Sequence, residues 1–117
     1  MKISVVVATY NRKELLKKLI DSLLNQNYED YEVIIVDDGS NDGTKEMLNG
    51  IKSKKLKFIT QENLYPAVAR NNGVKISKGE IIAFTDDDCI VNKNWLKEIK
   101  KCFEENKDII AVEGKTT

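Results

Sequence analysis

The sequence predicts an α/β fold in which a mostly parallel sheet carries helices on both faces. Short apolar runs rich in β-branched residues recur along the chain, and segments with apolar residues at helical spacing separate them. The connections between these segments are short. Strict alternation of strand and helix favours parallel pairing, with the helices packed on the sheet. The length of 117 residues fits one domain, residues 1–117.

The first elements are the most strongly patterned. Residues 3–8 form a continuous apolar run, which predicts a strand buried on both faces. A helix is expected over residues 12–26, with Asn11 as its cap. Its apolar face consists of Leu15, Leu16, Leu19, Ile20, Leu23 and Leu24. Residues 31–36, "YEVIIV", predict a second buried strand.

Turn residues then introduce a short helix. The stretch "DDGSNDGT" contains two glycines and several capping side chains. Asp42 or Ser40 is expected to cap the helix, whose apolar residues are Met47, Leu48 and Ile51. Residues 56–60 predict a third, weaker strand.

The remaining elements continue the alternation. Pro66 stands at a favourable first helical position, and Gly79 is the expected stop of that helix. Residues 80–85 predict the fourth strand. A helix with Trp95, Leu96, Ile99 and Phe103 on one face follows it. Residues 109–112 predict a fifth strand, which completes a Rossmann-like order of elements.

Composition excludes several classes of function. Lys plus Arg and Asp plus Glu number 19 each, so the net charge of zero gives no reason to expect nucleic acid as a partner. The chain has no histidine, and its two cysteines lack metal-ligand spacing, which argues against a zinc site. No stretch reaches the roughly eighteen apolar residues of a membrane span. We therefore expect a cytoplasmic protein without a direct membrane span.

Polar side chains cluster where three of the strands end. The clusters are Thr9–Arg12, Asp37–Ser40 and Asp86–Asp88. In a sheet of order 3-2-1-4 they would line one crevice beyond the carboxyl ends of the strands. Acidic clusters of this kind also serve as turns and caps, but three adjacent acids exceed what a cap needs. Five carboxylates around one crevice require a counter-charge, and Mg²⁺ or Mn²⁺ on a diphosphate would supply it.

At these residues the sequence resembles glycosyltransferase family 2, whose members have the GT-A fold. The resemblance covers nearly the whole chain and rests on three segments in the family's order. These are "SVVVATYNR", "YEVIIVDDGSNDGT" and "ARNNGVKISKGEIIAFTDDDC". The resemblance implies the nucleotide-sugar-binding half of such an enzyme. It also implies a donor that is most often a UDP-sugar and a divalent metal on the donor's diphosphate.

Residue roles follow from the same resemblance. Tyr10 would pack against the base or ribose, with Thr9 lining the same turn. Asp38 would hydrogen-bond the base, and Asp37 would be a lesser contributor. A carboxylate can accept a hydrogen bond from N3–H of uracil, which selects this base. Arg70 would meet the diphosphate or the acidic turn.

The acidic triad matches the family's DXD motif. Asp86 and Asp88 are its outer acids and the expected metal ligands for Mn²⁺ or Mg²⁺. Asp88 is the first choice, and Asp86 is expected nearer the ribose. Asp87 fills the variable position and is counted among the donor-binding residues, so the pair that binds the metal is left open.

The sequence departs from the family by ending early. Family members continue into a half that carries the acceptor site and the general base, so residues 1–117 look truncated and no catalytic base is assigned. The acceptor, a saccharide or another hydroxyl compound, is unknown. We expect donor binding with weak or absent transfer, and self-association through the face left open. Three interpretations stand: an inverting glycosyltransferase, a non-catalytic binding fragment, and a Mg²⁺-dependent phosphoryl-transfer or receiver-like domain with Lys115 beyond its fifth strand.

Overall fold

The computed structural model describes residues 1–62, 65–105 and 111–113. Five strands form one sheet in the order β3-β2-β1-β4-β5, and all four pairings are parallel. The strands are β1 (Ile3–Thr9), β2 (Tyr31–Asp37), β3 (Leu56–Thr60), β4 (Ile81–Phe84) and β5 (Ala111–Glu113). The predicted α/β class is confirmed, as is the predicted order of the first four strands.

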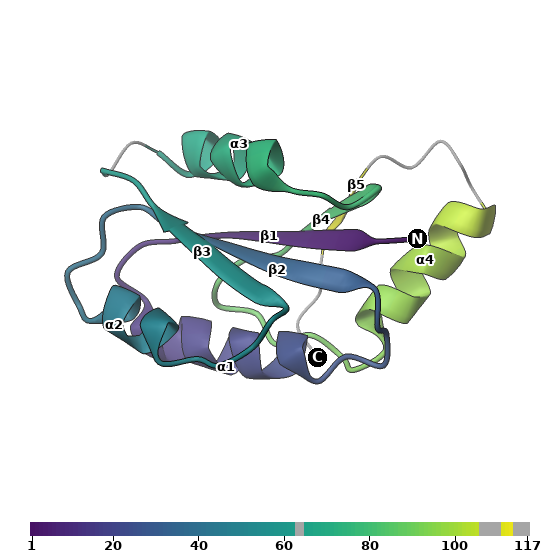
Figure 1. The fold of residues 1–117 in the computed structure, drawn as a ribbon, viewed down its shortest axis with the longest axis horizontal. Coiled ribbons are helices and arrows are strands. Elements are labelled where there is room, and N and C mark those ends of the chain that lie inside the picture. The colour runs from purple at the N-terminus through teal and green to yellow at the C-terminus, as the bar shows by residue number, and fades with distance from the viewer. Residues whose placement is uncertain (63–64, 106–110, 114–117) are drawn as a thin grey trace.

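Helices cover both faces of the sheet. They are α1 (Lys13–Leu24), α2 (Thr44–Asn49), α3 (Pro66–Ile76) and α4 (Trp95–Glu105). Helices α1 and α2 lie on one face and α3 on the other (Figure 1). Among the described residues, no helix combines the length and apolar character that a bilayer crossing requires.

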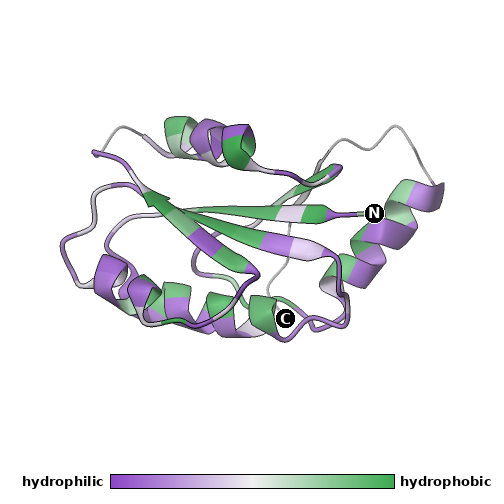
Figure 2. Cartoon of the chain, in the orientation of Figure 1, coloured by the Kyte–Doolittle hydropathy of each residue, from purple (hydrophilic) through white to green (hydrophobic). Residues whose placement is uncertain are grey.

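Alternation along the strands divides the apolar core between the two faces. Val5 and Val7 of β1 belong to the larger core, which also contains the buried sides of α1 and α4. Val6, between them, points to the opposite face and packs with Ile34, Val36 and Ala69. In Figure 2 hydrophobic green predominates along the strands and alternates with hydrophilic purple along the helices. The side-chain period of two in a strand requires this division.

Glycine lets α3 approach the sheet closely. A Cβ added at Gly73 would lie 2.5 Å from Val6 Cγ1 and 3.2 Å from Val36 Cγ2. These distances are too short for a methyl group, so a larger residue would push the helix away. The close contact fixes the distance between α3 and the sheet. It thereby also positions Arg70, which lies on α3.

Two details differ from the sequence prediction. Helix α3 ends at Ile76 with Ser77 as its C-cap, so Gly79 is not its stop. Gly79 instead lies against β1, where a Cβ would be 2.6 Å from the backbone nitrogen of Ser4. Strand β5 covers Ala111–Glu113, and residues 109–110 of the predicted strand lie outside the described residues.

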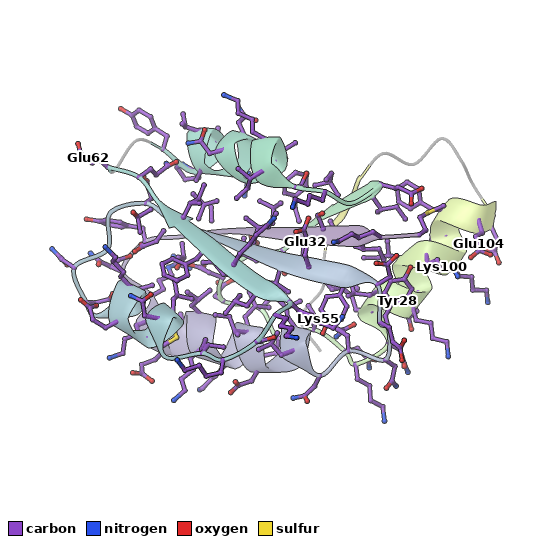
Figure 3. The ribbon with its side chains drawn as sticks, viewed as in Figure 1. Tyr28, Glu32, Lys55, Glu62, Lys100 and Glu104 are labelled. Atoms are coloured by element: carbon purple, nitrogen blue, oxygen red, sulfur yellow. The ribbon has the colours of Figure 1, made fainter. Side chains whose placement is uncertain are left out.

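A carboxylate ties the amino ends of the strands together. Glu32 on β2 (labelled in Figure 3) accepts hydrogen bonds from Ser4 Oγ at 2.6 Å, from the Lys78 backbone nitrogen at 2.6 Å and from Lys57 Nζ at 2.8 Å. Burial raises the pKa of Glu32, but these three donors outweigh it and lower the pKa to about 2. The network links β1, β2 and β3 to the turn before β4.

The lowered pKa makes stability depend on pH. Because the folded pKa of about 2 lies below the ordinary value of 4.5, Glu32 stabilises the fold above pH 4.5, and this contribution is lost as the pH falls toward 2. We expect Glu32→Gln to lower the free energy of unfolding at pH 7 by roughly 2 kcal/mol. The difference from wild type should shrink steadily between those two pH values. Urea unfolding at a series of pH values measures both quantities.

The exposed carboxylate Glu105, at the end of α4, offers a matched control. Glu105→Gln should leave the pH dependence of unfolding unchanged. A difference between Glu32→Gln and wild type that stays constant from neutral to acid pH would contradict the assignment.

Candidate functional site

A cleft of about 420 Å³ lies at the carboxyl ends of the strands. In Figure 1 the strands β1, β2 and β3 run toward this end, on the left of the view. The cleft is lined by Ala8, Thr9, Tyr10, Arg12, Asp38, Pro66, Arg70, Thr85, Asp86, Asp87 and Asp88. The three polar clusters that the sequence places at strand ends therefore meet in one cleft.

Asp37 is the one predicted donor-binding residue that does not line the cleft. Its side chain is buried, and its Oδ1 accepts a hydrogen bond from the Ser40 backbone nitrogen at 3.1 Å. This bond is typical of an Asx turn. Asp37 shapes the turn that carries Asp38.

Hydrogen bonds hold the loops after β1 and β2 together. The Asp38 nitrogen donates to Thr9 O at 2.9 Å, which extends the β1–β2 pairing beyond the sheet. The Asn11 nitrogen donates to Ser40 Oγ at 2.8 Å, and the Asn41 nitrogen donates to Asn11 Oδ1 at 2.8 Å. These bonds hold the loop that carries Tyr10 against the loop that carries Asp38.

The prediction that Asn11 caps α1 is wrong. Asn11 has φ of +51°, a left-handed conformation that asparagine adopts more readily than most residues. The first helical nitrogen, of Lys13, is instead capped from another loop by Asp42 Oδ2 at 3.0 Å. The N-cap of α2 is Gly43 and not Asp42, although Asp42 Oδ1 accepts from the nitrogen and hydroxyl of Thr44, the first residue of α2, at 3.2 and 2.5 Å. Ser40 is not the cap.

The central acid of the triad points into the protein. Asp87 is 7% exposed, and its two oxygens accept from Thr9 Oγ1 at 3.0 Å and from Arg12 Nη1 at 3.2 Å. Burial raises the pKa of Asp87, and the charge of Asp88 adds to this, whereas Thr9 and Arg12 oppose it. Asp87 joins the end of β4 to the end of β1.

The outer acids of the triad face the solvent, each beside an arginine. Arg12 Nη1 lies 3.6 Å from Asp88 Oδ2, and Arg70 Nη2 lies 3.7 Å from Asp86 Oδ1. Arginine therefore supplies counter-charge to all three carboxylates. Arg12 belongs to the polar cluster that was predicted to line the crevice, although no role was assigned to it among the predicted site residues.

The outer acids fit a divalent cation. One oxygen each of Asp86 and Asp88 and the sulfur of Cys89 all lie within 4.8 Å of one another. Carboxylate oxygens are the ligands that Mg²⁺ and Mn²⁺ prefer, whereas a buried thiol suits softer metals. Beside them, the buried Thr85 Oγ1 has no hydrogen-bond partner among the described residues. Asp86 and Asp88 are the pair available to a metal.

The segment after the triad is fastened to the end of α1. Ser22 Oγ accepts from the Val91 nitrogen at 3.2 Å. Gln26 Nε2 donates to Asn92 O at 2.7 Å. Gln26 Oε1 accepts from the nitrogen of Leu96, near the start of α4, at 3.0 Å. The triad is thus fixed on its upstream side by β4 and on its downstream side by α1.

Comparison with known proteins agrees with this geometry. The family model described as Glycosyl transferase family 2 matches residues 4–115. The chain belongs to glycosyltransferase family 2. Membership in this family decides against the receiver-like interpretation, and Lys115, on which that interpretation relied, lies outside the described residues.

Proteins similar to this chain include named glycosyltransferases. The poly(ribitol-phosphate) beta-glucosyltransferase of Bacillus spizizenii is 37% identical over an alignment of 118 positions, which covers 96% of this chain and 19% of that enzyme. The crystal structure of S. aureus TarS 1-349 in complex with UDP-GlcNAc has a TM-score of 0.83 and 33% identity, with 92% of this chain and 32% of that chain covered. This chain thus spans less than a fifth of the Bacillus spizizenii enzyme and about a third of the TarS chain.

A third similar protein was solved with a metal. The mannosyltransferase PcManGT from Pyrobaculum calidifontis, in complex with GDP-Man and Mn²⁺, has a TM-score of 0.79 and 28% identity. The match covers 86% of this chain and 32% of that chain. The GT-A fold implied by the family resemblance is confirmed by these neighbours.

The role of Asn11 in joining the loops after β1 and β2 can be tested by measuring stability. Asn11→Ala removes the bond from Asn41 and forces alanine into a left-handed conformation. We expect a loss of about 2 kcal/mol in the free energy of unfolding. Asn11→Gly removes the same bond but tolerates the positive φ, and should lose about half as much. Equal losses from the two variants in urea unfolding would show that the backbone conformation contributes nothing.

Proposed function

We propose that residues 1–117 form the donor site of a glycosyltransferase that binds a UDP-sugar together with Mn²⁺ or Mg²⁺. The observation that carries the proposal is the single cleft with Asp38 on one side and the exposed pair Asp86 and Asp88 on the other. A carboxylate that binds the base and a metal site that binds the diphosphate would together recognise two parts of a nucleotide-sugar. TarS, which is similar to this chain, was solved with UDP-GlcNAc.

Tyr10 and Asp38 are the proposed base-binding residues. The Tyr10 side chain is half-exposed at the cleft, and such a ring can stack on a base. Asp38 is buried apart from its cleft-facing part, and its carboxylate can accept the N3–H of uracil. Thr9 lines the same turn and keeps Asp87 in place through its hydroxyl.

Arg70, Asp86 and Asp88 are the proposed diphosphate end of the site. When bound, the cation would neutralise the diphosphate and stabilise the departing nucleotide. Arg70 lies close enough to Asp86 to bind a phosphate oxygen in its place. Asp87 acts indirectly, because both of its oxygens are already engaged in holding Arg12 and Thr9.

Transfer of the sugar, with inversion, to a saccharide or other hydroxyl acceptor is proposed for the whole protein. Donor binding is proposed for residues 1–117 themselves, with weak or no transfer by this part alone, because the matched relatives are several times longer. Self-association and a cytoplasmic location remain predictions that no finding tests.

Calorimetric titration of the chain with UDP tests the proposal. We expect binding that requires Mn²⁺ and that Asp88→Ala weakens by about tenfold or more, because a lost contact to a charged group costs about 1.5–3 kcal/mol. The control Asp21→Ala removes an exposed acid from α1 and should bind like wild type. Absence of UDP binding by the wild type, with and without Mn²⁺, would refute the proposal of a uridine donor.

Arg12 is expected to compete with the cation for Asp88. Arg12→Gln removes the positive charge and retains an amide that can still donate to Asp87. The variant should bind Mn²⁺ without nucleotide about fivefold more tightly, which corresponds to about 1 kcal/mol of repulsion removed at an exposed site. Calorimetry with Mn²⁺ alone measures the effect.

Lys17→Ala removes an exposed positive charge from the same helix region and serves as the control for net charge. Equal or weaker Mn²⁺ binding by Arg12→Gln would mean that Arg12 supports the metal site and does not compete for it.

A further inference from the structure

A chain of two amide side chains ends on Asp38. Asn72 Nδ2 donates to Gln61 Oε1 at 2.6 Å, and Gln61 Nε2 donates to Asp38 Oδ1 at 2.9 Å. Gln61 directly follows β3, and Asn72 lies on α3. The three side chains come from three different elements, so the chain of bonds connects the second and third strands with the helix above them.

The backbone of Gln61 is fixed as well. Its nitrogen donates to Asp37 O at 2.9 Å, one residue before Asp38. Backbone and side chain of Gln61 therefore contact successive residues of the turn after β2. Gln61 and Asn72 are both partly buried, which shields their bonds from competing water.

The direction of the bonds fixes the orientation of the Gln61 amide. A carboxylate only accepts hydrogen bonds, so Gln61 must turn its NH₂ group toward Asp38. Its oxygen then faces Asn72, which donates to it. Without Asn72, the amide would lose the partner that keeps its oxygen away from the carboxylate.

We infer that Gln61 and Asn72 are positioning residues that set the base selectivity of the cleft through Asp38. The inference rests on the proposed function. With Gln61 bonded to one oxygen, the Asp38 carboxylate is held in one orientation at the cleft and stays an acceptor. Uracil offers N3–H to such an acceptor, whereas cytosine offers a lone pair at the same ring position and is repelled.

Uridine and cytidine diphosphates separate this role from donor binding in general. They carry the same ribose and diphosphate, so the ratio of their dissociation constants reports on the base edge alone. We expect the full chain with Mn²⁺ to prefer UDP over CDP. Gln61→Leu, which keeps the bulk and loses the amide, should reduce this preference about five- to tenfold.

Asn72, which is linked to Asp38 through Gln61, supplies a second test. Asn72→Ala should reduce the UDP preference about threefold, and it should have no further effect when combined with Gln61→Leu. Such non-additivity identifies one chain of bonds. Asn49→Ala, an exposed amide on α2, should leave the ratio unchanged. Thermal unfolding of each variant separates lost selectivity from lost stability.

The outcomes distinguish the inference from the function on which it rests. A wild type that fails to bind UDP overturns both. A wild type that binds UDP and CDP equally overturns the inference and leaves donor binding intact. Folded variants at Gln61 and Asn72 that retain the wild-type ratio overturn it in the same way. If Gln61→Leu does not fold, the ratio measured with Asn72→Ala decides.

Discussion

The parallel pairing of β1 with both β2 and β4 brings the site together. Thr9, the last residue of β1, pairs with Asp37, so Asp38 begins just beyond the sheet. Phe84, the last residue of β4, pairs with Val6, three residues before the end of β1. The acids after β4 therefore run alongside the last residues of β1, and Asp87 meets the Thr9 hydroxyl. A shift of either register by one residue would turn these side chains to the opposite face.

Three adjacent carboxylates are tolerated because they occupy different environments. Asp87 is turned inward, and its two donors, Thr9 and Arg12, offset part of the cost of burying its charge. Asp86 and Asp88 are turned outward, where water screens them and arginines lie nearby. From the sequence, the positive charge needed among the acids was assigned to a metal. In the structure arginines lie beside the acids, so the proposed cation would have to displace Arg12 from Asp88.

The fold was predictable from local pattern because the strands are uniform apolar runs and the helices carry clear apolar faces. The gathering of Thr9, Asp38 and the triad followed from the strand order, since parallel strands end at one edge. The individual contacts between side chains that are distant in the sequence were not predictable. Arg12 meets acids 75 and 76 positions later, and Gln61 meets Asp38 through a side chain that no local pattern marks.

The errors have the same origin. Asn11 stands where a cap is expected, but the nitrogen of Lys13 donates to Asp42, which is 29 positions further along the chain. Asn11 joins the two loops instead. Gly79 stands where a helix stop is expected, but the close approach of β1 is what excludes a side chain there. In both cases a contact with another element overrides a correct local preference. Such contacts can be inferred from sequence only after the packing is known.

The carboxylates at the two ends of the sheet show what separates a structural acid from a ligand-binding one. Glu32 at the amino end is buried, and three donors within 2.8 Å hold it ionised. These donors already occupy its oxygens. At the carboxyl end Asp86 and Asp88 are exposed, and their arginine partners lie at 3.6 Å or more, beyond the distance of a good hydrogen bond. A cation or phosphate can displace partners held so weakly at little cost. The number and closeness of donors, and not the presence of an acid alone, suit the acid at the amino end to stability and the acids at the carboxyl end to the proposed binding.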